Sequence, residues 1–244
     1  MLSTWAKRGR SSDTAVLETE TPMLMQKERE LIIEYCARML KDGLTVGTSG
    51  NISVRVGENI AITPSGVDYE ALVPEGICVI TLNGEHVDGP DNPSTEVPMH
   101  TVVYENTDAL AVVHTHPVYA TVLGTLVDEM PLIHYMLALL GGPVRVAPYA
   151  QFGTEELARN CEVAMRDRYG VLLQNHGATT YGDTLAKAYS RSIYLEWLCR
   201  IYCEAKTLGE PRLLTAVEFD AVAHSLSTYG RSAVKSTSAR PGRL

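Results

Sequence analysis

The spacing of hydrophobic residues changes from helical to extended after the first forty positions of the chain. From 23 to 41, apolar residues recur every three or four positions, which predicts an amphipathic helix that Gly43 ends. Short apolar runs separated by turn residues such as Gly57 then predict sequential strands. These strands are expected at 51–56, 59–63, 77–82 and 83–87. The first third is therefore predicted to be built from β-hairpins.

From residue 95 onward, helical and extended patterns alternate. Helices are expected at 95–106, 117–124, 133–140, 154–167, 183–206 and 216–227, and strands at 109–116, 144–148 and 170–174. Asp183 is a plausible N-cap for the long helix. Hairpins followed by alternating strands and helices predict an α/β protein with α+β-like layering. Its mostly antiparallel or mixed central sheet should carry helices on both faces in three layers.

The two ends of the chain differ from its centre. Residues 1–22 are polar and mixed in charge, which predicts a flexible lead-in, and 230–244 carry four basic and no acidic residues, which predicts a disordered basic tail. Between them, 23–229 show neither a repeat nor a Pro/Ser-rich linker, so one domain is expected. Since no signal peptide or membrane-spanning run is recognised, the expected location is cytoplasmic.

Charge and cysteine content narrow the function classes. The 244 residues include 29 acidic and 21 basic side chains, for a net charge of -8. This charge opposes general attraction to nucleic acid or anionic membranes, and the tail offers only four charges for such binding. The five cysteines are scattered and form no C-x-x-C pair, which favours reduced core thiols over a disulfide framework or a thiolate zinc site.

Two histidines in the apolar run AVVHTHPVYAT are the first candidates for chemistry. His114 and His116 would share one face of a strand, because side chains two residues apart do so. Such a pair alone is more commonly two hydrogen-bonded histidines at a strand end. A catalytic zinc needs three protein ligands. The other histidines are His86, His100, His134, His176 and His224. Among them, His176 ends a buried strand in a glycine-bounded turn, QNHGA, and is the predicted third ligand.

The segment NPSTEVPMH places a carboxylate at the start of a helix. Ser94 could cap this helix, and the helix dipole alone would favour an acidic residue in its first turn. A capping box would need its acid at the position of Val97, however, so Glu96 is not required for capping. A carboxylate near a divalent cation can act as a ligand, a general base or both in turn. Glu96 is therefore a candidate for either role.

Two glycine-containing turns rich in hydroxyl groups, GTSGNIS and TPSGVDYE, offer sites for an anion. Tight turns between hairpin strands are the common explanation for such segments. Backbone N–H groups, the Asn51 amide and the Ser65 hydroxyl could also hold a phosphate without a lysine. Donors at Ser94 and Thr95, at a helix N-terminus, would add to such a site. A net-acidic protein could bind an anionic substrate in this way.

Seven motifs together resemble one known family. GTSGNISVR, ITPSGVDYEAL, STE, AVVHTHPVYATVL, IHYMLALLGG, APYAQFGTEEL and LLQNHGA occur in the order and near the spacing of the zinc-dependent class II sugar-phosphate aldolase and epimerase family. The resemblance covers about 24–230 and is greatest to members that cleave L-fuculose 1-phosphate. It implies the class II aldolase fold. The family usually has Ser-Ser-Glu where this chain has Ser-Thr-Glu, which keeps a hydroxyl beside the phosphate.

The resemblance also implies a set of functional residues. Zn²⁺ would be held by His114, His116, His176 and Glu96, and Glu96 would also act as the acid/base. Phosphate contacts are implied for Gly50, Asn51, Ser65, Gly66, Ser94 and Thr95. Tyr135, in IHYM, matches a catalytic tyrosine that reaches the site across a subunit interface, and Tyr229, in STYG, resembles a second one. A homotetramer with active sites between subunits is therefore implied.

The implied reaction is the reversible cleavage of a ketose 1-phosphate to dihydroxyacetone phosphate and a small aldehyde such as L-lactaldehyde or acetaldehyde. The substrate would be L-fuculose 1-phosphate or a 5-deoxypentulose 1-phosphate, and the sequence does not distinguish them. Alternatives on the same scaffold are 4-epimerisation of a pentulose 5-phosphate and dehydration of a methylthioribulose phosphate. An alternative of another class is an interaction module without the metal site. Tyr135 favours the aldolase, and the four candidate metal ligands oppose the module.

Overall fold

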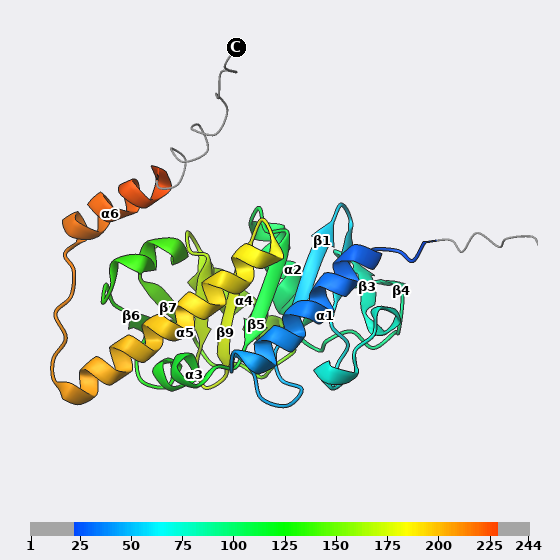
Figure 1. The fold of residues 1–244 in the computed structure, drawn as a ribbon, viewed down its shortest axis with the longest axis horizontal. Helices are drawn as coiled ribbons and strands as arrows, with labels where there is room; N and C mark the ends of the chain where they lie inside the picture. The colour runs from blue at the N-terminus through cyan, green and yellow to red at the C-terminus, as the bar shows by residue number, and fades with distance from the viewer. Residues whose placement is uncertain (1–21, 229–244) are drawn as a thin grey trace, which may run out of the picture.

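A nine-stranded mixed sheet forms the centre of the protein (Figure 1). The computed structural model describes residues 22–228. The strand order is β4-β3-β2-β1-β5-β9-β8-β7-β6, and all neighbours are antiparallel except the parallel pair β7–β8. The strands are β1 Asn51–Val56, β2 Asn59–Ile62, β3 Cys78–Thr81, β4 His86–Asp88, β5 Ala111–Thr115, β6 Glu129–Met130, β7 Val144–Ala147, β8 Gly170–Leu173 and β9 Gly177–Gly182. The predicted mixed sheet is confirmed.

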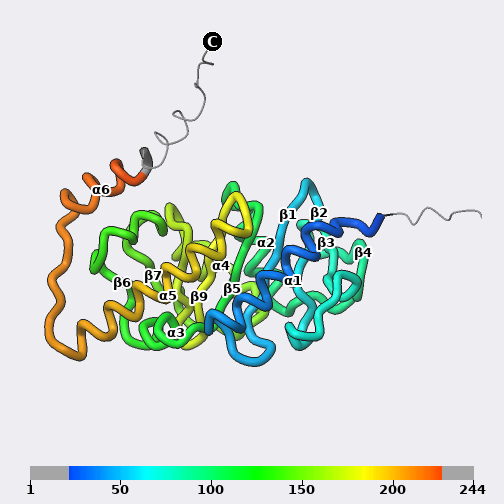
Figure 2. Tube along the Cα trace, in the orientation of Figure 1, coloured from blue at the N-terminus to red at the C-terminus, as the bar shows by residue number. Residues whose placement is uncertain are grey.

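Helices cover both faces of this sheet (Figure 2). The α-helices are α1 Gln26–Lys41, α2 Val97–Asn106, α3 Val118–Gly124, α4 Glu155–Met165, α5 Leu185–Leu208 and α6 Ala216–Thr228, and the 3₁₀ helices are η1 Tyr69–Ala71, η2 Pro74–Gly76 and η3 Tyr135–Leu140. Alternate residues of β2 show the two-sided packing. Ile60 and Ile62 pack with α2 and α4, whereas Ala61 packs with α1 and α5. The predicted three layers are therefore present.

The structure corrects three expectations for individual elements. Strands β6 and β9 were not predicted, and β9 is central and entirely buried. Its threonine hydroxyls are satisfied inside the protein, since Thr180 Oγ1 lies 2.8 Å from Ala188 O. The predicted helix 133–140 is the 3₁₀ helix η3. The N-cap of α5 is Thr184, whose hydroxyl accepts a hydrogen bond from Lys187 N, and not Asp183, which lies outside the helix.

Close strand pairing brings the candidate site together. The β1–β5 register places Asn51 opposite His114. On the other side of β5, a Cβ on Gly177 would lie 2.2 Å from Thr115 O, so only glycine allows β9 to begin this close. The adjacent His176 is thereby held beside the end of β5. None of the helices among the described residues has the length and apolar character required to cross a membrane.

Candidate metal centre and phosphate pocket

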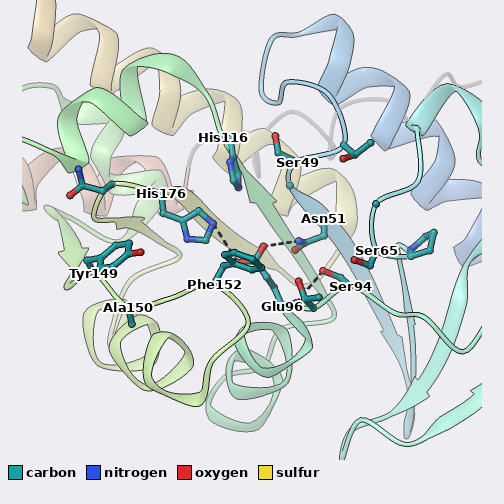
Figure 3. Close-up of a pocket in the computed structure, with 16 residues that line it drawn as sticks. Ser49, Asn51, Ser65, Ser94, Glu96, His116, Tyr149, Ala150, Phe152 and His176 are labelled. Carbon is teal, nitrogen blue, oxygen red and sulfur yellow. Dashed lines mark hydrogen bonds and ion pairs between the residues drawn. The ribbon is translucent and has the colours of Figure 1, made fainter.

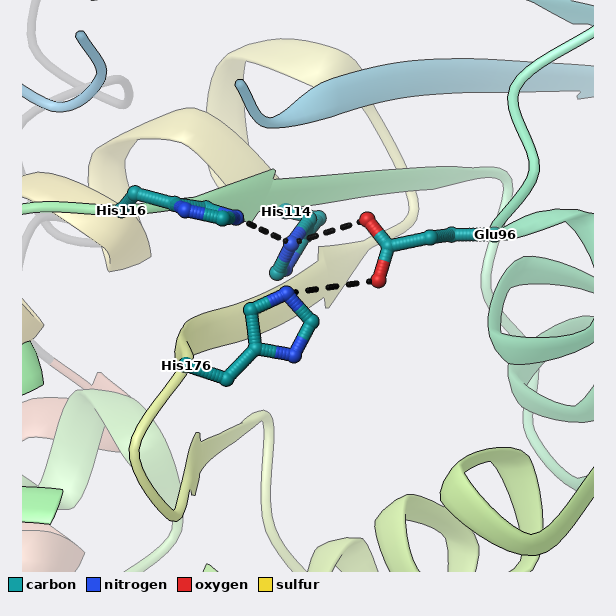
Figure 4. Close-up of side chains that lie close together, drawn as sticks. All are labelled: Glu96, His114, His116 and His176. Carbon is teal, nitrogen blue, oxygen red and sulfur yellow. Dashed lines mark hydrogen bonds and ion pairs between the residues drawn. The ribbon is translucent and has the colours of Figure 1, made fainter. Parts of the chain in front are cut away.

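Three histidines and one glutamate converge at the end of β5 (Figure 4). His114 lies in β5, His116 directly follows it, His176 precedes β9, and Glu96 is the N-cap residue of α2. The three imidazole rings lie 4.7–4.8 Å apart by their centroids, and the four ligand atoms lie within 4.8 Å of one another. The structure thus brings together all four residues predicted to bind a metal.

The hydrogen bonds of His114 show which of its ring nitrogens faces the other candidate ligands. Its Nδ1 lies 3.1 Å from Ala178 O, a pure acceptor, so Nδ1 donates a hydrogen bond there and Nε2 is the nitrogen turned toward the other candidate ligands. Nε2 faces His116 Nε2 at 2.8 Å and Glu96 Oε2 at 3.1 Å. A divalent cation between these atoms would be coordinated by two imidazole nitrogens and a carboxylate oxygen. The arrangement therefore fits a bound metal ion.

The two oxygens of Glu96 have different surroundings. The Asn51 amide nitrogen donates to Oε2 over 2.9 Å. Oε1 faces His176 Nε2 at 3.4 Å and, among the described residues, is a buried side-chain oxygen without a hydrogen bond. A buried carboxylate oxygen left in this way is costly unless a cation or proton completes it. Oε1 is thus the oxygen of Glu96 that is available to a metal or a proton.

The protonation states also suit metal binding. Burial, followed by the neighbouring His114, lowers the pKa of His116 to about 3 and that of His176 to about 4, so both rings are neutral at pH 7. Burial acts to raise the pKa of Glu96, but His114, His176 and the Asn51 amide together hold that pKa well below its usual range. Neutral imidazoles and an ionised carboxylate are the forms that bind Zn²⁺.

The metal-free protein should lose stability as the pH falls from about 6.5 toward 4. Burial lowers the pKa of His100 to about 3, so the unfolded chain takes up a proton in this range while the folded chain does not. His100 alone should lower the free energy of unfolding by about 1.4 kcal/mol per pH unit. Urea denaturation at several pH values measures the slope. His100→Gln should reduce the slope by about that amount, while His116 and His176 keep their own contributions. An unfolding free energy that is independent of pH over this range would contradict a buried, neutral His100.

A cavity of about 410 Å³ opens beside the metal ligands (Figure 3). Glu96, His116 and His176 line one part of it. All six predicted phosphate contacts line the same cavity: Gly50, Asn51, Ser65, Gly66, Ser94 and Thr95. Within the described residues, no lysine or arginine lines it. Among the described residues, the pocket can therefore bind an anion through a metal, hydroxyl groups, the Asn51 and Asn175 amides and backbone N–H donors, and not through a basic side chain.

The backbone N–H groups of two serines that line this cavity are already used. Ser65 N donates to Asn92 O over 2.9 Å, and Ser94 N donates to Thr63 O over 3.0 Å. The Ser94 hydroxyl oxygen accepts from Glu96 N at 3.2 Å, which leaves its own proton to be donated. These two residues therefore offer hydroxyl groups, and not backbone N–H groups, to an anion.

Comparison with known proteins agrees with this geometry. Residues 30–203 match the family described as Class II Aldolase and Adducin N-terminal domain. The chain belongs to the class II aldolase family. This confirms the resemblance found in the sequence motifs and the expectation of an aldolase of the carbon–carbon lyase type.

Three similar proteins illustrate the relationship within the class II aldolase family. The chain is 40% identical over 212 residues to the 5-deoxy-D-ribulose 1-phosphate aldolase of Bacillus thuringiensis serovar kurstaki, covering 86% of this chain and 100% of the relative. It is 39% identical over 207 residues to the 5-methylthioribulose-1-phosphate/5-deoxyribulose-1-phosphate aldolase of Rhodospirillum rubrum, covering 84% and 93%. A solved L-fuculose 1-phosphate aldolase, 39% identical, superimposes with a TM-score of 0.81 over 84% of this chain and 98% of its own.

Of the two predicted tyrosines, the structure describes only Tyr135, which lies apart from the aldolase pocket. Tyr135 begins η3, is 44% exposed, and stacks on His134 with the ring centroids 4.5 Å apart. It does not line the cavity formed by its own chain. Tyr229 lies outside the described residues, as do the predicted lead-in up to residue 21 and the basic tail. An exposed aromatic residue away from its own pocket is available to a neighbouring subunit.

One residue that supports the aldolase site was missed by the sequence analysis. Glu196, on α5, accepts hydrogen bonds from the backbone N–H groups of Tyr119 at 2.9 Å and Ala120 at 2.8 Å. These N–H groups belong to the first turn of α3, directly after His116 and Pro117. Glu196 thus fixes the chain that follows a candidate metal ligand. No local sequence signal could have indicated this, because the contact joins residues more than seventy positions apart.

Proposed function

We propose that the protein is a zinc-dependent aldolase that cleaves a ketose 1-phosphate reversibly to dihydroxyacetone phosphate and a small aldehyde. The observation that carries this proposal is the position of the metal ligands in the same cavity as the hydroxyl-rich phosphate turns. Three imidazoles and a carboxylate form a ligand set preferred by Zn²⁺. When bound, zinc would supply a Lewis acid that withdraws electrons from the substrate carbonyl.

The residues of the chain would move the proton that cleavage requires. When the C3–C4 bond breaks, the C4 hydroxyl loses its proton to become the aldehyde, and the electron pair that remains on C3 takes up a proton. We assign the protonation of C3 to Glu96. The Asn51 N–H occupies Oε2, so a proton on Glu96 belongs on Oε1. Because Glu96 is ionised in the free site, this proton must first reach it from substrate or solvent.

The C4 hydroxyl proton is assigned to Tyr135 of a neighbouring subunit, directly or through water. The exposure of Tyr135 and its distance from the pocket of its own chain support this role. It requires active sites at subunit interfaces, and the homotetramer implied by the family resemblance would supply them. Tyr229 remains a candidate for a second contact with the aldehyde portion. A fully active monomer in solution would contradict this part of the proposal.

A substrate panel tests the reaction. Zinc-loaded protein should release dihydroxyacetone phosphate from at least one of 5-deoxyribulose 1-phosphate, 5-methylthioribulose 1-phosphate and L-fuculose 1-phosphate, the substrates named for the relatives. The ratio of kcat/KM values would identify the group preferred beyond C4. A coupled reductase measures the release. Epimerisation of a pentulose 5-phosphate, or dehydration of the methylthio sugar, without release of dihydroxyacetone phosphate would overturn the aldolase assignment.

A further inference from the structure

A chain of buried polar side chains leads from Glu96 into the core between α2 and β1. Asn51 contacts Glu96, His100 Nε2 lies 2.5 Å from Asn51 Oδ1, and His100 Nδ1 lies 2.7 Å from Ser53 Oγ. Ser53 Oγ in turn lies 2.7 Å from the Tyr104 hydroxyl. His100 and Ser53 are completely buried, and Tyr104 is 2% exposed. Neither the sequence motifs nor the proposed reaction gives a role to His100, Ser53 or Tyr104.

The donor and acceptor of each hydrogen bond follow from the carboxylate. An ionised carboxylate only accepts, so the Asn51 amide nitrogen must face Glu96 and its oxygen must face His100. An amide oxygen only accepts, so His100 Nε2 carries the proton and the Nδ1 of the neutral ring accepts from Ser53. The single Ser53 proton is then used, so Tyr104 donates to the Ser53 oxygen. In each of these hydrogen bonds, therefore, the donor is the residue farther from Glu96 and the acceptor is the residue nearer to it.

We propose that His100 is a positioning residue for Glu96: through the Asn51 amide it fixes Oε2 and keeps Oε1 turned toward His176. If the amide of Asn51 rotated, its oxygen would face the carboxylate and repel it. His100 prevents this rotation, because its Nε2–H requires the amide oxygen as acceptor. Ser53 and Tyr104 keep the His100 tautomer fixed. The inference rests on the proposed function of Glu96 as the acid/base.

A pair of variants at His100 separates positioning from folding. His100→Leu removes the donor to Asn51, whereas His100→Gln can place an amide N–H near the position of Nε2. We expect His100→Leu to lower kcat by about 10- to 100-fold, with KM changed by less than about threefold and with zinc content unchanged. His100→Gln should recover most of this loss. Equal kcat in His100→Leu and the wild type, or no recovery in a folded His100→Gln, would overturn the proposal.

Two serine variants provide a matched control that remains informative if His100→Leu does not fold. Ser53 and Ser192 are both buried, and each hydroxyl lies within 2.7 Å of another hydroxyl: Tyr104 Oη for Ser53 and Thr180 Oγ1 for Ser192. Both Ser→Ala changes should lower the thermal midpoint. Only Ser53→Ala should lower kcat, by about tenfold. An equal loss of kcat in both variants would show a general effect of destabilisation and would contradict positioning.

A spectroscopic measurement tests the proposal without any substrate. With ¹⁵N-labelled histidine, the long-range ¹H–¹⁵N spectrum should show His100 as the neutral tautomer with its proton on Nε2. A proton on Nδ1 would reverse the direction of donation and overturn the proposal. If no ketose 1-phosphate is cleaved but this tautomer is found, the proposed function fails while the hydrogen-bond order stands. If cleavage occurs with the Nδ1 tautomer, only the positioning role fails.

Discussion

Glu96→Gln should lower kcat for carbon–carbon cleavage by about 10²- to 10⁴-fold while the protein still binds zinc. The Asn51 N–H should hold the glutamine oxygen at the position of Oε2, which places the amide nitrogen at the position of Oε1. An amide nitrogen cannot accept and return a proton there. The three histidines remain, and they are sufficient ligands for a catalytic zinc. The variant should therefore lose turnover but keep its zinc.

Two quantities are measured for each variant: the rate of dihydroxyacetone phosphate release and the zinc content per chain. Glu162→Gln is a matched control, because Glu162 lies on α4 and pairs with Arg166 outside the site. This control should turn over at the wild-type rate. A Glu96→Gln variant that retains turnover within about threefold of the wild type would remove Glu96 from the acid/base role.

His114→Ala should lose zinc and activity together. His114 is completely buried, and its Nε2 faces both His116 and Glu96. Its removal breaks the ligand set at its centre and leaves an apolar methyl group beside the remaining ligands. Zinc content after dialysis and the rate of cleavage should both fall by more than about tenfold, since a single ligand contributes much of the affinity of such a site.

His86→Ala is the matched control for this variant. His86 lies in β4, is exposed, and contacts Gly89 O, away from the metal ligands. It should keep full zinc content and full activity. If His114→Ala retained wild-type zinc content and rate, the metal would have to bind elsewhere, and the site described above could not be the catalytic one.

Much of the fold and the metal site could be predicted because their signals are local. His114 and His116 share one face of a strand, and His176 follows an apolar strand, so their convergence at one sheet edge could be expected from spacing together with the resemblance. Strand β9 was missed because its threonines read as polar loop residues. They are buried because groups in the protein interior, some of them distant in sequence, satisfy their hydroxyls: Thr179 Oγ1 lies 3.4 Å from Met99 Sδ, eighty positions away.

The support around the site could not be predicted for a similar reason. His100 was weighed only as a metal ligand, because nothing in the sequence indicates that its ring lies between Asn51 and Ser53. Glu196 gives no local signal, since it accepts hydrogen bonds from the N–H groups of a helix that is far away in the sequence. Motifs indicate residues that carry chemistry, whereas the residues that orient them depend on tertiary contacts.

The most direct test of the central claim is a zinc titration of metal-free protein with 5-deoxyribulose 1-phosphate as substrate. The rate of dihydroxyacetone phosphate release should be near zero without metal, rise in proportion to added zinc, and reach a plateau at about one zinc per chain, as expected for one four-ligand site in each chain. Release that proceeds at full rate in the metal-free protein would contradict a metal-dependent aldolase at Glu96 and the three histidines.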